Sequence, residues 1–428
     1  MRILFISQEL IGSGLCLRLV REGHDVKLFI NDPDRKECLD GFVEKTKSWK
    51  KELKWVGTDG LIIFDDVGFG KVQEELREAE YNVFGGNVEA DRLELDRGYG
   101  QRVLHSHGIK ILPSFNFKSI DSAIEFVREN PVKWVVKQNT HISSLNHVGE
   151  QADASDVLEV LQQYKENKIK HVHLQKKAEG IEVGIARYFN GNDWVGPIEI
   201  NHEHKRLEDG DTGPLTAEMG TIMWHSSDEN LPLFEATLKK IKPYLQKIQY
   251  KGDIDINCIV TEHDVWPLEL TPRLGTPSTE LQCELYESSL GEFILACATG
   301  ASHDLKYKDG YGIVLSLGLP PFPFPPKANE NDKKDYTIKH GLTKRHEPSV
   351  HFEEVSKRIN NDSEEMYWAG SYGYLGYITA SAKSVPKAKQ KAMNMLKKFD
   401  VPDLIHRTDI GDRVHKNDLK LLKKWGWI

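Results

Sequence analysis

The stretch GDIDIN (252–257) carries an oxygen-bearing side chain at every second position. Asp253, Asp255 and Asn257 would share one face of a β-strand, because successive side chains of a strand point to opposite faces. Carboxylate and amide oxygens are the ligands that magnesium prefers, whereas zinc sites are usually built from nitrogen and sulfur. This strand is therefore a candidate for holding a hard divalent cation.

A turn at TEHD (261–264) would bring a second strand back along the first. If the chain turns around His263, a two-fold count pairs Asn257 with Glu269 and Asp255 with Thr271. Directly opposed residues have Cβ atoms about 5 Å apart, so both side chains of a pair can reach one cation. The alternative is an ordinary hairpin with an acidic face toward solvent, since polar outer faces of antiparallel sheets are common.

Arg273 continues the parity of Glu269 and Thr271 and would project beside the same cluster. A guanidinium there matches the geometry of a phosphate or a carboxylate. The hairpin thus predicts a place where an oxygen-bound cation and an anionic ligand lie close together.

The segment EHKRLEDGDTGPLTAEMG (203–220) places cations directly before acids and a stiff turn. The cationic side chains are His204, Lys205 and Arg206, and the acids are Glu208, Asp209 and Asp211. A solvated loop would tolerate this composition, but solvation does not require this order. A ligand-binding segment is the other interpretation.

Several single residues could contact a nucleotide, although each also has an ordinary structural explanation. Lys137 ends an expected strand, where a lysine can act as a point charge on a phosphate or simply be solvated. The backbone at Lys177 and Ala178 could contact an adenine edge, and Glu182 could accept hydrogen bonds from ribose hydroxyls. Gly12-Ser13-Gly14 opens the first helix, where free amides favour an anion.

The composition is that of a globular chain with 428 residues, long enough for about three domains. A net charge of -8 argues against a nucleic-acid surface as the main function. The five cysteines are far apart and form no CxxC pair, which disfavours zinc and a disulfide framework and favours the cytoplasm. No stretch approaches the roughly 20 apolar residues of a membrane span.

The hydrophobic periodicity predicts an α/β and α+β multidomain chain that begins with a parallel sheet. Strands are expected at 2–7, 25–30, 60–66 and 81–86, and helices at 12–23 and 71–80. A middle unit would contain helices at 119–131 and 157–167, strands at 133–139 and within 171–193, the hairpin and a helical stretch at 278–300. Near residue 304 the pattern changes to a β-rich tail with one further helix.

Taken together, these segments resemble the phosphoribosylamine–glycine ligase family of the ATP-grasp superfamily. That family carries a DHKR–DTGPNTGGMG signature, matched by 203–220, and a strand close to EFNCRFGDPE, matched by ELTPRLGTPS (269–278). Its RKDIG segment resembles RTDIG (407–411). LELDRGYGQRVLHSHGI (93–109) is similar to the helix after the first domain, and WVVKQ (134–138) to the strand with the ATP lysine.

The resemblance implies an ATP-grasp fold with four parts. These are an N-terminal α/β domain (1–113), a lid (114–184), a central domain with the magnesium hairpin (185–304) and a C-terminal α+β domain (305–428). It also implies that ATP activates a carboxylate as an acylphosphate, which an amine then attacks. The implied cofactors are ATP and Mg²⁺, with Mn²⁺ possible, and the partners are an amino acid and an amine. Neither a nucleic acid nor a membrane is implied, and the expected state is a monomer or homodimer.

The resemblance also assigns roles to individual residues. ATP would contact Arg97, Lys137, Gln175, Lys177, Ala178 and Glu182. Magnesium would be held by Glu269, Asn257 and Thr271. The catalytic residues would be Lys205, Arg273 and Asp211, and the substrates would meet Gly12, Ser13, Gly14, Asp211, Thr212, Gly213, Glu218 and Gly275.

Four segments depart from the family pattern. THISSLNHVG replaces the glycine-rich loop GLAAGKGV, so Ser143, Ser144 or His147 would take over its contacts. QELIGSGL replaces GGREHA, AEMG replaces GGMG, and Thr271 replaces the asparagine of EFN. Three alternatives follow: a ligase for glycine and phosphoribosylamine, a ligase with the same chemistry for another amine such as a modified nucleotide, or an inactive nucleotide-binding relative.

Overall fold

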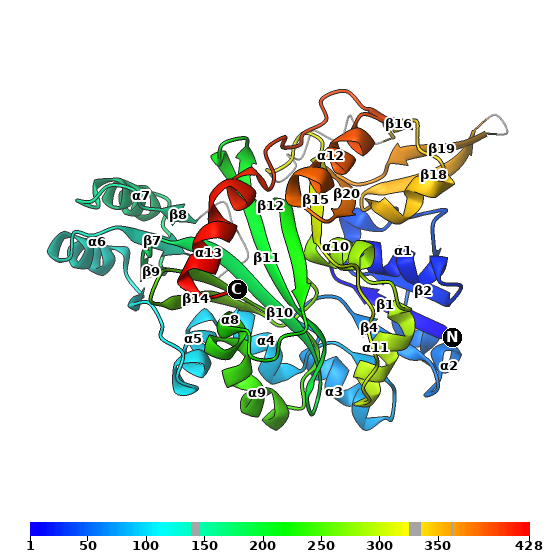
Figure 1. Cartoon of the computed structure of the whole chain (residues 1–428), viewed down its shortest axis with the longest axis horizontal. Coiled ribbons are helices and arrows are strands. Elements are labelled where there is room, and N and C mark those ends of the chain that lie inside the picture. Colours follow the sequence, from blue (N-terminus) through cyan, green and yellow to red (C-terminus); the bar gives the residue numbers. More distant parts are fainter. Residues whose placement is uncertain (138–145, 325–334, 361–362) are drawn as a thin grey trace.

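The computed structural model describes residues 1–137, 146–324, 335–360 and 363–428 (Figure 1). Among these residues, no helix is long and apolar enough to cross a membrane.

The chain begins with a five-stranded parallel sheet of order β3-β2-β1-β4-β5, which confirms the predicted alternation of strands and helices. Its strands are β1 (Arg2–Ser7), β2 (Asp25–Ile30), β3 (Glu44–Lys45), β4 (Leu61–Phe64) and β5 (Val83–Phe84). The central strands are almost wholly buried and apolar, as expected where helices cover a parallel sheet. The helices of this part are α1 (Ser13–Arg21), α2 (Trp49–Val56), α3 (Gly70–Glu78), α4 (Val88–Leu95) and α5 (Arg97–Ser106).

A small antiparallel sheet of order β6-β9-β7-β8 packs with two helices within the segment 114–184 that was predicted to be a lid, and this subdomain is called the lid below. Its elements are β6 (Ser114–Phe117), α6 (Ile120–Glu129), β7 (Trp134–Lys137), β8 (His147–Val148), α7 (Ser155–Glu166) and β9 (Val172–Lys176). The lid has its own apolar core, with Trp134, Val136 and Leu161 among its buried residues. Figure 1 shows the lid and the N-terminal sheet at opposite ends of the molecule.

The largest sheet has eight strands in the order β14-β13-β10-β11-β12-β15-β20-β17, all neighbours antiparallel. Its strands are β10 (Ile181–Asn190), β11 (Trp194–Glu208), β12 (Thr212–Ser226), β13 (Lys251–Val260), β14 (Val265–Thr271), β15 (Tyr311–Gly318), β17 (Val350–Phe352) and β20 (Tyr374–Ala382). The segment 203–220 is therefore part of two long paired strands rather than a loop.

The remaining helices and short strands surround this sheet. They are α8 (Pro232–Ala236), α9 (Leu238–Lys247), α10 (Ser278–Leu285), α11 (Leu290–Thr299), α12 (Val385–Leu396), α13 (Leu419–Trp425), β16 (Lys339–His340), β18 (Val355–Asn360), β19 (Ser363–Trp368) and β21 (Phe399–Asp400). In Figure 1, α13 lies over the large sheet beside the lid.

The domain boundary expected between residues 304 and 305 does not separate two sheets, because strands from both sides of it belong to the eight-stranded sheet. β15 pairs with β12, and β20 and β17 continue from β15, so residues on both sides of the boundary share one hydrogen-bonded sheet. One buried apolar cluster also joins Ile3 and Leu15 of the N-terminal part with Ile378 and Leu396 near the C-terminus. The tail is thus packed as part of the main body.

Gly220, the last residue of AEMG, occupies a position where a side chain does not fit. Its φ is +153°, and a Cβ atom would come within 2.5 Å of the carbonyl oxygen of Val314 on the adjacent strand β15. A glycine is needed here because the two backbones approach closely at an unusual dihedral angle.

We expect Gly220→Ala to lower the free energy of unfolding by about 1–3 kcal/mol, because either β12 or β15 must shift. Chemical denaturation measures this change. Gly341→Ala is the matched control, since its Cβ would meet only the carbonyl oxygen of Lys398 at 3.9 Å. An equal loss in both variants would contradict the steric explanation.

Candidate functional site

Two cavities meet in the middle of the molecule. One has a volume of about 870 Å³ and lies between the lid and the large sheet; the other, of about 760 Å³, lies between the large sheet and the N-terminal sheet. Glu203, Lys205 and Glu269 line both of them. These three residues therefore form the wall across which groups in the two cavities can meet.

The predicted hairpin register is confirmed. β13 and β14 pair Asn257 with Glu269 and Asp255 with Thr271, across a turn at residues 261–264. The register shifts between Asn257 and Cys258, because Val260 pairs with Val265 and Cys258 with Pro267 nearer the turn. Without this irregularity the four-residue turn would pair Asn257 with Leu268, so the observed pairs depend on a bulge as well as on the two-residue periodicity.

Opposite charges alternate around the shared wall. Lys205 Nζ lies 2.9 Å from Glu203 Oε2, 3.3 Å from Glu182 Oε1 and 3.5 Å from Glu269 Oε1. Arg97 Nη2, at the start of α5, lies 3.4 Å from Glu269 Oε2. Four elements of the fold thus bring these five residues together.

The same contacts set the ionisation of the wall. Lys205 and then Arg97 and Lys137 lower the pKa of Glu269 well below its usual range. Burial opposes the charge of Lys205, but Glu203, Glu182 and Glu269 outweigh it and raise the pKa of Lys205. Both groups are therefore charged at neutral pH.

Lys137 differs from Lys205 because its nearest partner is neutral. Its Nζ donates to Gln175 Oε1 at 2.9 Å at the end of β7. Burial, followed by the positive charge of Arg97, lowers the pKa of Lys137 to about 7. An anionic ligand beside it would favour the charged form.

The larger cavity combines an apolar slot with polar ends, as nucleotide sites do. It contains all six residues predicted to contact ATP: Arg97, Lys137, Gln175, Lys177, Ala178 and Glu182. Apolar walls come from Val135, Ile181 and Leu268. The backbone N–H of Lys177 already donates to the carbonyl of Lys133, so this amide is occupied.

The residues predicted to hold magnesium fit that ion in part. Asn257 donates both hydrogens of its Nδ2, to Glu182 and Glu203 at 3.0 Å, and its buried Oδ1 has no hydrogen-bond partner. This orphan oxygen and the ionised Glu269 are the oxygen donors that magnesium prefers. Thr271 lines only the smaller cavity, so its role as a ligand stays a prediction. No cluster of three or more His, Cys, Asp or Glu residues suited to a metal occurs among the described residues.

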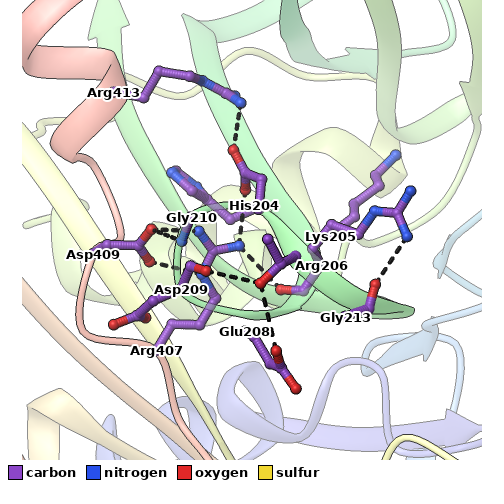
Figure 2. A network of polar contacts seen from close by, with 12 residues as sticks. His204, Lys205, Arg206, Glu208, Asp209, Gly210, Gly213, Arg407, Asp409 and Arg413 are labelled. Atoms are coloured by element: carbon purple, nitrogen blue, oxygen red, sulfur yellow. Dashed lines mark hydrogen bonds and ion pairs between the residues drawn. The ribbon is translucent and has the colours of Figure 1, made fainter. Parts of the chain in front are cut away.

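Figure 2 shows how the turn between β11 and β12 is held by the C-terminal segment. Arg407 Nη1 lies 2.8 Å from Asp211 Oδ1, and Arg413 Nη1 lies 2.7 Å from Asp211 Oδ2. The N–H of Gly210 donates to Asp409. RTDIG therefore fastens the DGDTGP turn, a role that the sequence alone did not indicate.

Both carboxylate oxygens of Asp211 are thus engaged by arginines, and Asp211 lines the larger cavity rather than the smaller. Thr212 and Gly213 are exposed at the turn and line neither cavity. The structure brings Glu218, Arg273 and Gly275 together around the smaller cavity, but it does not place Asp211, Thr212 or Gly213 with them. Arg273 is ion-paired there with Asp66 and Glu94.

The glycines at the start of α1 do not present free amides. The N–H of Gly12 donates to Asp65 Oδ2 at 3.0 Å, that of Ser13 to the carbonyl of Leu10 at 3.0 Å, and that of Gly14 to Glu280 Oε1 at 3.1 Å. All three residues are buried. The expectation that an external anion binds these amides was wrong for this geometry, because side chains distant in the sequence already occupy them.

Of the residues proposed to replace the glycine-rich loop, Ser143 and Ser144 lie outside the described residues. His147 Nε2 lies 3.4 Å from Asp156 Oδ2.

Several cavity residues were missed from the sequence. Glu199 and Glu203 have the same parity on β11 as Lys205, which was predicted, and this period-two pattern could have identified them as part of one polar face. Leu421 and Trp425 of α13 line the larger cavity, and Arg35 and Glu353 line the smaller one. No local pattern marks these last four, since the fold alone brings them to the cavities.

Residues 96–279 match the sequence profile described as "Phosphoribosylglycinamide synthetase, ATP-grasp (A) domain". The chain is 24% identical over 352 residues to the phosphoribosylamine–glycine ligase of Lactococcus lactis, covering 80% of this chain and 81% of that protein. It is 25% identical over 408 residues to the enzyme of the same name from Vibrio parahaemolyticus, covering 88% and 86%.

Two crystal structures illustrate the likeness in fold. That of the Thermotoga maritima phosphoribosylamine–glycine ligase superposes with a TM-score of 0.72 at 18% identity, covering 96% of this chain and 100% of that one. Biotin carboxylase from Campylobacter jejuni gives 0.62 at 13% identity, with 97% and 95% covered. The expected ATP-grasp fold is confirmed.

Proposed function

The chain is a divergent member of the phosphoribosylamine–glycine ligase family in the ATP-grasp superfamily, and from this premise we propose that it is an ADP-forming carboxylate–amine ligase. The observation that supports this best is the shared wall of the two cavities. Glu203, Lys205 and Glu269 face both a slot suited to a nucleotide and a second, polar cavity suited to the other substrates.

In the proposed reaction, a carboxylate oxygen of the amino acid attacks the γ-phosphorus of ATP. The bond from that phosphorus to the β–γ bridging oxygen breaks, and ADP leaves. The amine nitrogen then attacks the acyl carbon, the carbon–oxygen bond to phosphate breaks, and inorganic phosphate leaves as the nitrogen loses its excess protons to water.

Lysine and arginine side chains of the chain would neutralise most of the negative charge on the transferring phosphoryl group. Lys137 and Arg97 lie in the larger cavity where the phosphates would end, and Lys205 stands at the junction. Positioned cations stabilise the negative charge that develops on a transferring phosphoryl group. Glu269 and Asn257 would hold Mg²⁺, or Mn²⁺ in its place, and the ion would add positive charge at the same oxygens.

The second substrate pair is open between two candidates. Glycine and phosphoribosylamine are the pair named in the relatives, whereas the occupied amides at Gly12 and Gly14 favour a different amine.

The five cysteines are all buried and free of disulfides, which supports a cytoplasmic location.

We expect the purified chain to release ADP over many turnovers only when a carboxylate and an amine are both present, because the amine consumes the acylphosphate formed in the first step. A coupled assay over a panel of amino acids and amines, with phosphoribosylamine included, measures this. Addition of hydroxylamine in place of the amine should trap the acylphosphate as a hydroxamate. If ATP binds but neither ADP nor hydroxamate forms with any acid, the ligase proposal fails and an inactive nucleotide-binding relative remains.

A further inference from the structure

The smaller cavity is strongly acidic. Its lining contains nine carboxyl side chains against the three cations Arg35, Lys205 and Arg273. Each of these cations is already ion-paired: Arg35 with Glu353, Lys205 with Glu203, and Arg273 with Glu94. A phosphorylated ligand would therefore find an excess of negative charge and few available counter-charges.

The floor of this cavity is formed by four of the acids, on neighbouring strands of the large sheet. These are Glu199 on β11, Glu218 on β12, and Asp253 and Asp255 on β13. On β10, between β11 and β13, Ala186 stands opposite both Glu199 and Asp255. This small side chain leaves room above the sheet between the two flanking carboxyl groups.

No arginine or lysine of the described chain forms an ion pair with these four acids; their hydrogen-bond donors are neutral amides. Gln282 Nε2 donates to Glu199 at 2.8 Å and to Asp253 at 3.0 Å, and Asn201 Nδ2 donates to Asp255 at 2.9 Å. Lys205 favours the ionised form of Glu218, but its ion pairs are made with Glu182, Glu203 and Glu269, so none of the four floor acids has an ion-pair partner among the described residues.

Two of the floor carboxyl groups have an oxygen without any partner. Glu218 is 6% exposed and its Oε1 has no hydrogen-bond partner; Asp253 is 4% exposed and the same holds for its Oδ1. Buried polar atoms normally have partners, and a buried charge needs a counter-charge. Both residues line the cavity, so a ligand there can supply what is missing.

From this arrangement, and resting on the ligase function proposed above, we propose that the acceptor amine is an aliphatic diamine or polyamine. One nitrogen, uncharged, attacks the acylphosphate near Lys205, while at least one other nitrogen, as an ammonium, binds the floor carboxylates. The carboxyl groups of Asp65 and Glu280 at the start of α1 agree with this, because they occupy amides that a phosphate would otherwise use.

The ionisation of the floor supports the same ligand. Burial raises the pKa of Glu199 to about 8 and that of Asp253 to about 6, and it also raises the pKa of Glu218. These carboxyl groups are therefore partly protonated and neutral, because no cation is paired with them. A bound ammonium would favour their ionised forms.

Calorimetry on the full chain with putrescine, spermidine, butylamine and ribose 5-phosphate tests the proposal. We expect spermidine and putrescine to bind at least tenfold more tightly than butylamine, and ribose 5-phosphate not to bind in the smaller cavity. Glu218→Gln and Asp253→Asn should each weaken spermidine binding about tenfold. Glu129→Gln, an exposed residue at the end of α6, is the control and should change nothing.

The melting temperature of each variant and its affinity for ATP are measured as controls alongside these titrations. Glu218→Gln is isosteric and removes a buried acid, so it should melt no lower than the parent chain. Equal affinity for butylamine and spermidine, unchanged spermidine affinity in both variants, or ribose 5-phosphate binding that competes with spermidine would each overturn the proposal. Hydroxamate formation does not involve the acceptor, so it reports separately on whether the ligase chemistry exists.

Discussion

Glu269→Ala abolishes ATP turnover while the protein keeps its fold: this is the largest functional effect we expect from one substitution. Glu269 lies within 3.5 Å of both Arg97 and Lys205 and lines both cavities. Its loss removes the carboxylate predicted to hold magnesium and the group that positions both cations. A fall in kcat of about 10²–10³-fold or more is the scale seen when one preorganised electrostatic group is lost.

The affinity for ATP need not fall in this variant. Removing a negative charge beside Arg97 and Lys205 leaves these cations free to attract phosphate, so kcat should change far more than KM. The backbone pairing of β14 with β13 does not depend on this side chain, and its side chain is 38% exposed. We therefore expect the melting temperature to stay within a few degrees.

Steady-state kinetics of ADP release and thermal melting measure these two quantities. Glu262→Ala is the matched control, because Glu262 is an exposed residue in the turn of the same hairpin. A normal kcat in Glu269→Ala would contradict the proposal that this hairpin holds magnesium and positions the cations that bind phosphate.

Arg407→Ala should give the largest loss of stability. The Arg407 side chain is 1% exposed and lies 2.8 Å from Asp211 and 2.7 Å from Asp409, while also donating to the carbonyl of Arg206. Removing one partner of a buried ion pair costs about 3–5 kcal/mol, because charges are left without compensation. Asp211 keeps Arg413, so we expect a value near the lower end of that range, about 3 kcal/mol.

The pH dependence provides a second test of this contact. Burial opposes the ionisation of Asp409, but Arg407 and the Gly210 N–H outweigh it and hold the pKa of Asp409 well below 3.8. A lowered carboxyl pKa contributes stability that is fully present above the unfolded pKa and is lost as the pH falls through the folded pKa. The gap between the parent chain and Arg407→Ala should therefore be largest near pH 7 and shrink below pH about 4.

Urea denaturation at several pH values measures this gap. Arg413→Ala is the comparison variant, since its side chain is 45% exposed and an exposed pair contributes no more than about 1 kcal/mol. Equal losses in the two variants, or a gap that does not change between pH 7 and pH 3, would show that burial of Arg407 is not the cause.

Local patterns predicted those parts of the site that are built by neighbours in the chain. The pairing of Asn257 with Glu269 was predicted by counting outward from His263, although the hairpin reaches it through a bulge next to Asn257. The strand ending at Lys137 followed from its apolar run. The first parallel sheet was also predictable, because strand and helix periodicities alternate without interruption. In these cases the interacting residues are close in sequence or repeat regularly.

The tertiary structure decided which groups remain available to a ligand. Gly12 and Gly14 looked like an anion site until Asp65 and Glu280, 53 and 266 residues away, proved to occupy their amides. Asp211 looked like a substrate-binding acid until Arg407, 196 residues away, proved to hold it. The residue pattern was enough to predict the strands and helices around the larger cavity and the residue types that line it. Only the packing of distant segments determined that the second cavity is acidic and uncompensated, because burial and charge pairing are properties of the assembled fold.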